Sequence, residues 1–255
     1  MAWTAPKGRP GVSEKPNRGM ARLGFVVPVS NTNLEPDMYS THPLGASVHF
    51  ARAGGYDLDK VPDSEQMAQF ADSSLEPVLG DLCATRPDVV AYGCTSATLT
   101  RGPDYDRAFC RKMQGIAGVP CVTAAGALHE ALVQLGIKTV SFTSPYTRQL
   151  NQEGADFLEA AGVEVVKVAY IGQDLDNYGQ SGLKPADVFE LGVRADHPDA
   201  DCVVLSCTDM RALEILDQLE QHLGKTVISS NQALMHVAAG RLGIRSRVPG
   251  KLGRV

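Results

Sequence analysis

Two cysteines of this chain occur in the same local pattern, and that pattern could support thiol chemistry. The stretch from Asp88 reads D-V-V-A-Y-G-C-T-S-A-T-L, with Cys94 shortly after an apolar run. The stretch from Asp201 reads D-C-V-V-L-S-C-T-D-M-R-A-L, with Cys207 in the equivalent place. A short β-branched run that passes into a helix-like pattern is typical of a buried parallel strand followed by a helix. We therefore expect both cysteines at strand-to-helix turns.

Such a turn favours a reactive thiol. A cysteine there lies among unpaired N–H groups at the positive end of the helix dipole, and both favour thiolate over thiol. The threonines that follow the cysteines, Thr95 and Thr208, have hydroxyl and N–H groups that can hold a carboxylate. A single strand-end cysteine is more often a packing residue, but two at matching positions favour a functional pair. Cys83 and Cys202 lack this context and are interpreted as packing residues.

Strands and helices alternate along the chain, and these elements must position the two cysteine turns. Besides the apolar run before Cys94, strands are expected at residues 21–29, 47–53, 119–123, 139–143, 164–170, 202–206 and 226–229. Helices are expected at residues 64–85, 102–116, 124–135, 150–161, 185–195, 212–223 and 232–242. Pro77 predicts a kink or a break in the first of these helices. Residues 172–182 are interpreted as a polar loop.

The two halves of the chain match in their order of elements and in sequence. V-T-A-A-G-A-L-H-E-A-L-V-Q-L-G-I starts at Val122, and I-S-S-N-Q-A-L-M-H-V-A-A-G-R-L-G-I starts at Ile228. This internal repeat predicts an α/β fold of two βαβ lobes with parallel sheets, related by a pseudo-twofold axis. The carboxyl ends of the strands would face one shared cleft, with Cys94 and Cys207 on opposite sides of a small ligand.

We divide the chain accordingly into a flexible N-terminal tail and two lobes. The tail is residues 1–20, the N-terminal lobe is residues 21–121 plus 232–255, and the C-terminal lobe is residues 122–231.

Polar residues follow other strands at the same predicted edge. Ser30 and Asn31 come after the first strand of one half, and Tyr146 comes after the first strand of the other. Asn177 lies in the polar loop at 172–182. Turn formation explains such residues, since Asn, Ser and Pro are common in turns. A ligand-contact role is the alternative, because ligands of open α/β sheets bind at the carboxyl ends of the strands.

Composition excludes several classes of function. The 255 residues are 44% hydrophobic and 21% charged with a formal net charge of −5, which gives no support for nucleic-acid binding. No apolar run approaches the about 18 residues that span a membrane, and residues 1–20 do not form a secretory signal. Reduced thiols and a cytoplasmic location are expected. The six histidines show no metal-ligand spacing, and the dinucleotide, nucleotide-triphosphate and serine-hydrolase motifs are missing.

Five motifs together resemble the aspartate/glutamate racemase superfamily, and within it the branch of maleate cis-trans isomerases and arylmalonate decarboxylases. They are V-V-P-V-S-N-T-N-L-E-P, A-Y-G-C-T-S, F-T-S-P-Y-T-R-Q-L-N, L-S-C-T-D-M-R and S-S-N-Q-A. The resemblance implies two Rossmann-like lobes, each with a four-stranded parallel sheet, an active site between them, no cofactor or metal, and a homodimer or higher homo-oligomer. It also implies a small carboxylic acid as substrate.

By the same resemblance, Cys94 is the nucleophile and Cys207 is the acid/base partner. The implied carboxylate ligands are Asn31, Tyr146 and Asn177, with the turn N–H groups of Thr95, Ser96, Thr208 and Asp209. The thiolate of Cys94 would add to maleate, Cys207 would donate a proton, and rotation in the succinyl adduct would lead to fumarate. This requires an ionised Cys94 and a protonated Cys207. We expect Arg211 to offset the charge of Asp209 if its side chain turns inward.

Three other functions stay open. A racemase or epimerase would use the same two cysteines across a Cα–H bond, although the loop V-S-N-T-N lacks the Asp-Ser opening of typical glutamate racemases. An arylmalonate-type decarboxylase is suggested by Thr95 and Ser96, but that branch lacks the first cysteine. A non-enzymatic dicarboxylate-binding protein would show ordinary thiol pKa values and slow alkylation.

Overall fold

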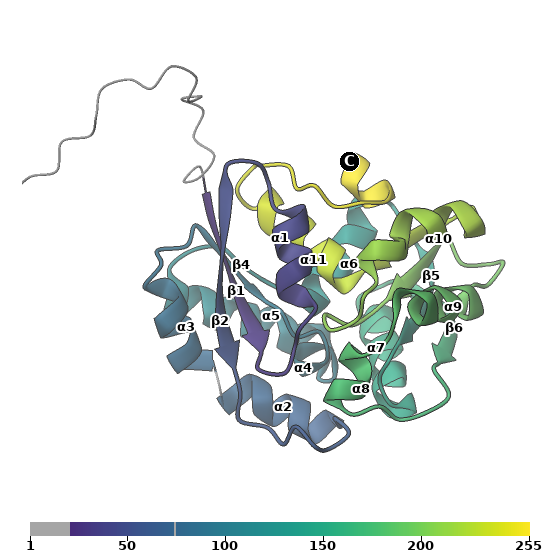
Figure 1. Ribbon diagram of the computed structural model, residues 1–255, viewed down its shortest axis with the longest axis horizontal. Coiled ribbons are helices and arrows are strands. Elements are labelled where there is room, and N and C mark those ends of the chain that lie inside the picture. Colours follow the sequence, from purple (N-terminus) through teal and green to yellow (C-terminus); the bar gives the residue numbers. More distant parts are fainter. Residues whose placement is uncertain (1–20, 74) are drawn as a thin grey trace, which may run out of the picture.

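The computed structural model describes residues 21–73 and 75–255, which form two four-stranded parallel sheets (Figure 1). The strand orders are β2-β1-β3-β4 and β6-β5-β7-β8, so the two halves repeat one topology. The strands of the first sheet are β1 (Ala21–Pro28), β2 (Ala46–Ala53), β3 (Val89–Tyr92) and β4 (Cys121–Thr123). Those of the second are β5 (Thr139–Ser144), β6 (Glu164–Tyr170), β7 (Cys202–Leu205) and β8 (Thr226–Ser229). The predicted fold class is therefore confirmed.

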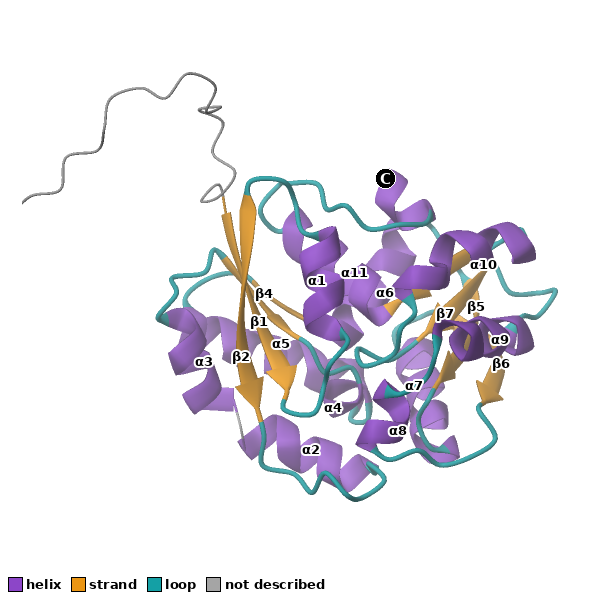
Figure 2. Ribbon diagram, viewed as in Figure 1, coloured by secondary structure: helices purple, strands orange, loops and turns teal. Residues whose placement is uncertain are grey.

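Helices connect successive strands in both halves (Figure 2). The first half contains α1 (Leu34–Thr41), α2 (Ser64–Ser73), α3 (Leu75–Cys83), α4 (Ser96–Leu99), α5 (Gly102–Ala117) and α6 (Ala124–Gln134). The second half contains α7 (Arg148–Ala160), α8 (Asn177–Ser181), α9 (Pro185–Ala195), the 3-10 turn η1 (Leu213–Ile215), α10 (Leu216–Leu223), α11 (Ser230–Gly240) and the 3-10 turn η2 (Lys251–Arg254).

Three predicted elements differ from the structure. The helix predicted at 64–85 corresponds to α2 and α3, which lie on either side of residue 74, outside the described residues, and no break occurs at Pro77. Pro77 lies in the first turn of α3, where a missing N–H costs little. The loop predicted at 172–182 contains α8, and the helix predicted at 212–223 is divided into η1 and α10. The predicted tail at 1–20 lies outside the described residues, and the division into lobes stays a prediction.

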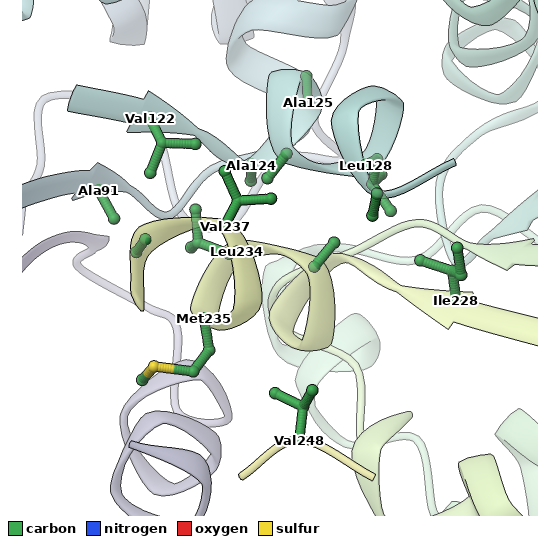
Figure 3. Close-up of a cluster of buried hydrophobic side chains, with 14 of the residues drawn as sticks. Ala91, Val122, Ala124, Ala125, Leu128, Ile228, Leu234, Met235, Val237 and Val248 are labelled. Carbon is green, nitrogen blue, oxygen red and sulfur yellow. The ribbon is translucent and has the colours of Figure 1, made fainter. Parts of the chain in front are cut away.

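One hydrophobic core connects the two sheets. It includes Phe25 of β1 and Phe142 of β5, both at most 1% exposed, together with the apolar faces of α6 and α11. Figure 3 shows Leu234 and Val237 of α11 beside residues of α6 and β4 in this core. Separate apolar clusters cover the other faces, with α2, α3 and α5 on the first sheet and α9 and α10 on the second. The helices α6 and α11 thus lie between the sheets.

Parallel pairing brings the carboxyl ends of the central strands to one edge of each sheet. Strand β1 pairs with β3, and the turns after both strands lie side by side because Gly93 donates its N–H to the Val26 carbonyl at 2.8 Å. Strand β5 pairs with β7 in the same way, and Ser206 donates to the Thr143 carbonyl at 2.8 Å. A Cβ at position 93 would lie 2.7 Å from Leu34 Cδ1, which explains the glycine before Cys94.

Candidate active site

A cavity at the carboxyl ends of the strands brings most of the predicted site residues together. Both cysteines line it, Cys94 after β3 and Cys207 after β7. The other predicted residues that line it are Asn31, Ser96, Tyr146, Asn177, Thr208 and Asp209. Thr95 is fully buried and is not among the lining residues. The two cysteines therefore share one cavity, contributed by opposite sheets.

Cys94 is a buried residue, 7% exposed, and lies two positions before α4 begins at Ser96. Burial raises its pKa, while the N–H groups of Ala97 and Ser96 and the Ser96 hydroxyl act in the opposite direction. The Cys94 sulfur lies 3.7 Å from Ser96 Oγ. The expectation that the helix start favours a thiolate at Cys94 is not met, because desolvation of the charged sulfur outweighs these donors.

The Cys207 thiol is also held in its protonated form. Burial and the nearby Asp209 carboxylate raise its pKa to about 12, although the Asp209 N–H donates to its sulfur at 3.3 Å. The two thiols therefore differ in their neighbours: Cys94 has a hydroxyl two residues on, and Cys207 has a carboxylate there.

Tyr146 lies beside both cysteine turns. The side chains of Cys207 and of Ser96, the residue two positions after Cys94, are close enough to its phenol to affect the phenol's pKa. Burial raises the pKa of Tyr146 well above its usual range, so the phenol stays neutral and can donate. The backbone around it is fixed, because its N–H donates to Ser144 Oγ at 3.2 Å and Asn151 donates to its carbonyl at 2.9 Å.

Asn31 lies where the two sheets approach each other. Its Oδ1 accepts the N–H groups of Asn33 and Leu34, at 3.0 and 2.9 Å, and so caps α1. Its Nδ2 donates to Thr208 Oγ1 at 3.1 Å. A turn residue of the first half is thereby oriented by the Cys207 turn of the second half.

Asp209 is held by the turn after β1. Its Oδ1 accepts the N–H groups of Thr32 and Asn33, at 3.0 and 3.2 Å, and the Asn33 side chain at 2.9 Å. Burial raises the pKa of this carboxyl group, and these donors oppose that shift. The condition for Arg211 to offset the charge of Asp209, an inward side chain, is not met: the exposed Arg211 side chain pairs with Glu214 at 2.7 Å.

The cavity also contains residues that the sequence did not single out. Tyr56 hydrogen-bonds with Ser30 Oγ at 2.9 Å, and Asn177 Nδ2 donates to the Leu58 carbonyl at 3.2 Å. The others that were missed are Pro28, Pro62, Met67, Phe70 and Gln180. Tyr56 and Pro62 belong to residues 54–63, which show no periodicity, whereas Met67 and Phe70 lie on the helix predicted at 64–85 and are interpreted from the sequence only as its apolar positions. For α8, which carries Gln180, the sequence did contain a signal. Aspartate is a preferred N-cap residue, and Asp176 caps α8 by accepting the Gly179 N–H at 2.6 Å.

The charge of the cavity is unusual for an anion site. Its described lining contains no Lys, Arg or His, and its one charged residue type is the aspartate at 209. Any carboxylate bound here would be held by neutral donors. Across residues 21–73 and 75–255, no group of three or more His, Cys, Asp or Glu could hold a metal ion, and no helix there is long and apolar enough to span a bilayer.

Known proteins are similar to this chain in sequence and in fold. The sequence model of the family described as arylmalonate decarboxylase matches residues 23–255. A maleate isomerase of Alcaligenes faecalis is 28% identical over 241 residues, covering 89% of this chain and 93% of that protein. The arylmalonate decarboxylase of Bordetella bronchiseptica is 25% identical over 212 residues, covering 82% of each.

A solved structure agrees with the sequence comparisons. The maleate cis-trans isomerase of Nocardia farcinica superposes with a TM-score of 0.81 at 26% identity, covering 92% of this chain and 98% of that one. The resemblance predicted from the cysteine motifs is thus confirmed. Since the family match extends over nearly the whole described chain, the protein is an enzyme that belongs to the arylmalonate decarboxylase family.

Proposed function

We propose that this enzyme converts maleate, or a closely related small dicarboxylate, to the trans isomer without a cofactor, with Cys94 as nucleophile and Cys207 as acid/base. The observation that carries the proposal is the placement of two cysteine thiols, from opposite sheets, in one buried cavity. The similarity to maleate isomerases supports the choice of substrate.

The reaction balances between these two thiols once Cys94 has released its own proton to solvent, and the Cys94 thiolate is regenerated at the end of the cycle. The Cys94 thiolate adds to one alkene carbon, the π bond breaks, and charge develops on the neighbouring carbon and its carboxylate. The Cys207 S–H protonates that carbon, which gives a succinyl thioether on Cys94 and a Cys207 thiolate. Rotation about the new single bond follows. Cys207 then removes a proton, Cys94 leaves as thiolate, and fumarate is released.

Neutral donors would hold the two carboxylates. The proposed ligands are the side chains of Asn31, Tyr146 and Asn177 and the turn N–H groups of Thr95, Ser96, Thr208 and Asp209. Fixed dipoles in a cavity that excludes water stabilise developing charge without reorganising. The neutral phenol of Tyr146 suits this role, because a buried tyrosine with a raised pKa remains a donor.

The protonated state required of Cys207 agrees with its surroundings, whereas burial opposes the ionisation required of Cys94. Cys207 must start as a thiol, and its pKa of about 12 is consistent with that state. Cys94 must lose a proton before it attacks, and the N–H groups of Ala97 and Ser96 lower the cost of that step relative to burial alone.

A decarboxylase is the second candidate, and one feature of the cavity favours it. Pro62, Met67 and Phe70 form an apolar side that would accept an aryl group. The similarity to the arylmalonate decarboxylase of Bordetella bronchiseptica supports this alternative. Cys94 argues against it, since decarboxylation with one acid/base group leaves this thiol without a role.

Proton NMR of maleate with the enzyme in D₂O tests the proposal, alongside Cys94→Ala and Cys207→Ala. We expect fumarate from the native enzyme and none from either variant. If the native enzyme forms no fumarate, the proposal that maleate is the substrate is wrong. Phenylmalonate in the same assay separates the second candidate, because decarboxylation would yield phenylacetate. Deuterium exchange at Cα of chiral amino or hydroxy acids would instead identify a racemase.

A further inference from the structure

The threonines that follow the two cysteines both reach across to the other half of the molecule. Thr208 Oγ1 donates to the Gly93 carbonyl at 2.8 Å, and Gly93 is the residue directly before Cys94. Thr95 Oγ1 donates to Ser230 Oγ at 3.0 Å, at the start of α11 after β8. All four residues lie in the buried interior where the turns meet. The sequence placed these hydroxyls on a substrate carboxylate, but each already has a protein partner.

A threonine hydroxyl has one proton to donate, and in both threonines a protein acceptor already takes that proton. The Thr208 hydroxyl gives its proton to Gly93 and accepts a hydrogen bond from Asn31 Nδ2 at 3.1 Å. It has no second proton for a bound carboxylate. A contact with substrate would require the Gly93 carbonyl to lose its donor in a buried place, which is costly.

The hydrogen bond from Thr208 to the Gly93 carbonyl directly connects the two cysteine turns. Thr208 is one residue after Cys207, and its acceptor is one residue before Cys94. Gly93 is itself fixed to β1 through its N–H bond to Val26. A change at the Thr208 hydroxyl would therefore be transmitted to the position of Cys94 in the opposite half.

We propose that Thr95 and Thr208 are positioning residues whose hydroxyls set the separation and orientation of the two cysteine thiols. Thr208 acts directly on the backbone before Cys94, and Thr95 connects the Cys94 turn to α11. This inference rests on the proposed two-cysteine reaction, in which Cys94 and Cys207 must act on neighbouring carbons of one substrate. A misplacement of about 1 Å in such a geometry can cost on the order of 100-fold in rate.

The first test is steady-state kinetics of Thr208→Val, which keeps the shape and removes the hydroxyl. We expect kcat to fall on the order of 10- to 100-fold with KM nearly unchanged, since positioning rather than binding is lost. Thr208→Ser keeps the hydroxyl and should restore most of kcat. Thr95→Val is the second variant, with the same expected direction, and serves if Thr208→Val does not fold.

A matched control separates positioning from a general loss of stability. Thr143 is also fully buried, and its Oγ1 donates to the Ala169 carbonyl at 2.9 Å within one sheet. Thr143→Val removes a comparable bond that does not connect the halves, so it should leave kcat and KM near the native values. A raised KM with native kcat in Thr208→Val would instead make Thr208 a substrate ligand and overturn the inference.

A second readout needs no substrate and so distinguishes failure of this inference from failure of the proposed function. The rate of Cys94 alkylation by iodoacetamide is followed against pH by peptide mass spectrometry. Thr208→Val should change the Cys94 rate profile, whereas Thr208→Ser and Thr143→Val should match the native protein. An unchanged Cys94 profile in both Thr208→Val and Thr95→Val overturns the inference, whether or not maleate is turned over.

Discussion

The protonation of the two site thiols follows from burial more than from their place at helix starts. A helix N-terminus stabilises a thiolate, but its effect is small beside the cost of removing a charged sulfur from water. Cys94 and Cys207 are 7% and 3% exposed, and each has few donors. A bound dicarboxylate adds negative charge to the cavity, which opposes the ionisation of either thiol further.

Alkylation against pH tests this protonation directly. Because the thiolate is the reactive form and the Cys207 pKa is raised to about 12, the Cys207 rate should still rise tenfold per pH unit at pH 9–10. The Cys94 rate should also continue to rise above the pH at which free cysteine, with a pKa of about 8.5, levels off. Peptide-resolved iodoacetamide labelling gives both profiles, with free cysteine as the control. A plateau below pH 9 for Cys207 would contradict the role of burial.

Sequence could predict the site residues that follow a recognisable strand, and it missed those that do not. The cysteines, Asn31 and Tyr146 come directly after buried apolar runs, so their positions at the sheet edge follow from the period of the pattern. Tyr56 comes from a stretch without periodicity, and only tertiary folding brings it to Ser30. The direction of the Arg211 side chain is set by its ion pair with Glu214. The sequence alone did not show whether Arg211 would pair with Glu214 or with Asp209.

At the scale of elements, a buried carboxylate connects α1 to α11. Asn231 Nδ2 donates to Asp37 Oδ2 at 2.8 Å and also to the Thr208 carbonyl at 2.9 Å. Burial raises the pKa of Asp37 to about 7, against a usual value of 3.8, although the Asn231 bond and Arg211 oppose the shift and Glu214 adds to it. The contact that supports the Cys207 turn thus includes a group that titrates near neutral pH.

Asp37→Asn should make stability less dependent on pH. Between pH 4 and 7 the folded protein retains a proton that the unfolded chain releases, so the Asp37 contribution falls as pH rises through 7. By linkage the full effect is at most about 4 kcal/mol. The variant keeps an acceptor for Asn231, and we expect it to be more stable than the native protein at pH 8 and similar at pH 4.

Urea unfolding at several pH values measures this difference. The exposed Asp81→Asn on α3 is the control and should leave the pH dependence of the free energy of unfolding unchanged. A native-like slope in Asp37→Asn would mean that other carboxyl groups, such as the buried Asp106, account for the pH dependence.

Element boundaries show where local patterns suffice. Long periodic helices and buried strands were predicted within two residues of their ends. A kink or a break was predicted at Pro77, yet this residue lies inside the first turn of α3, where proline is tolerated. Helix α8 has five residues, too few to show a period of 3.6.

At the scale of the whole molecule, the shared core makes the two sheets one folding unit. Side chains of β1, β3, β5 and β7 belong to the same cluster as those of α6 and α11. Neither half can expose this surface without losing its own core. We therefore expect one cooperative unfolding transition rather than two.

Leu234→Ala tests that expectation. Leu234 of α11 is fully buried between the sheets, and its truncation should cost about 2–5 kcal/mol. The loss should appear as a shift of one unfolding transition. Far-UV circular dichroism and calorimetry should give the same midpoint for that transition. Val133→Ala, at a residue 58% exposed, is the control and should change stability little. Two separate transitions in the native protein would contradict the shared core.

The packing of α6 against α11 also bears on how the two thiols came to differ. These helices occupy equivalent places in the repeat, so their contact has the form of an isologous interface between two copies of one half. In a dimer of identical halves, every site residue would occur twice in the same surroundings. Joining the halves covalently removes that constraint. Ser230 and Asn231 of α11 now stand where α6 has Ala124 and Ala125, and Asp209 stands where the other turn has Ser96. A symmetric ancestor could offer only two equal thiols, whereas one continuous chain can evolve a nucleophile and an acid from the same motif.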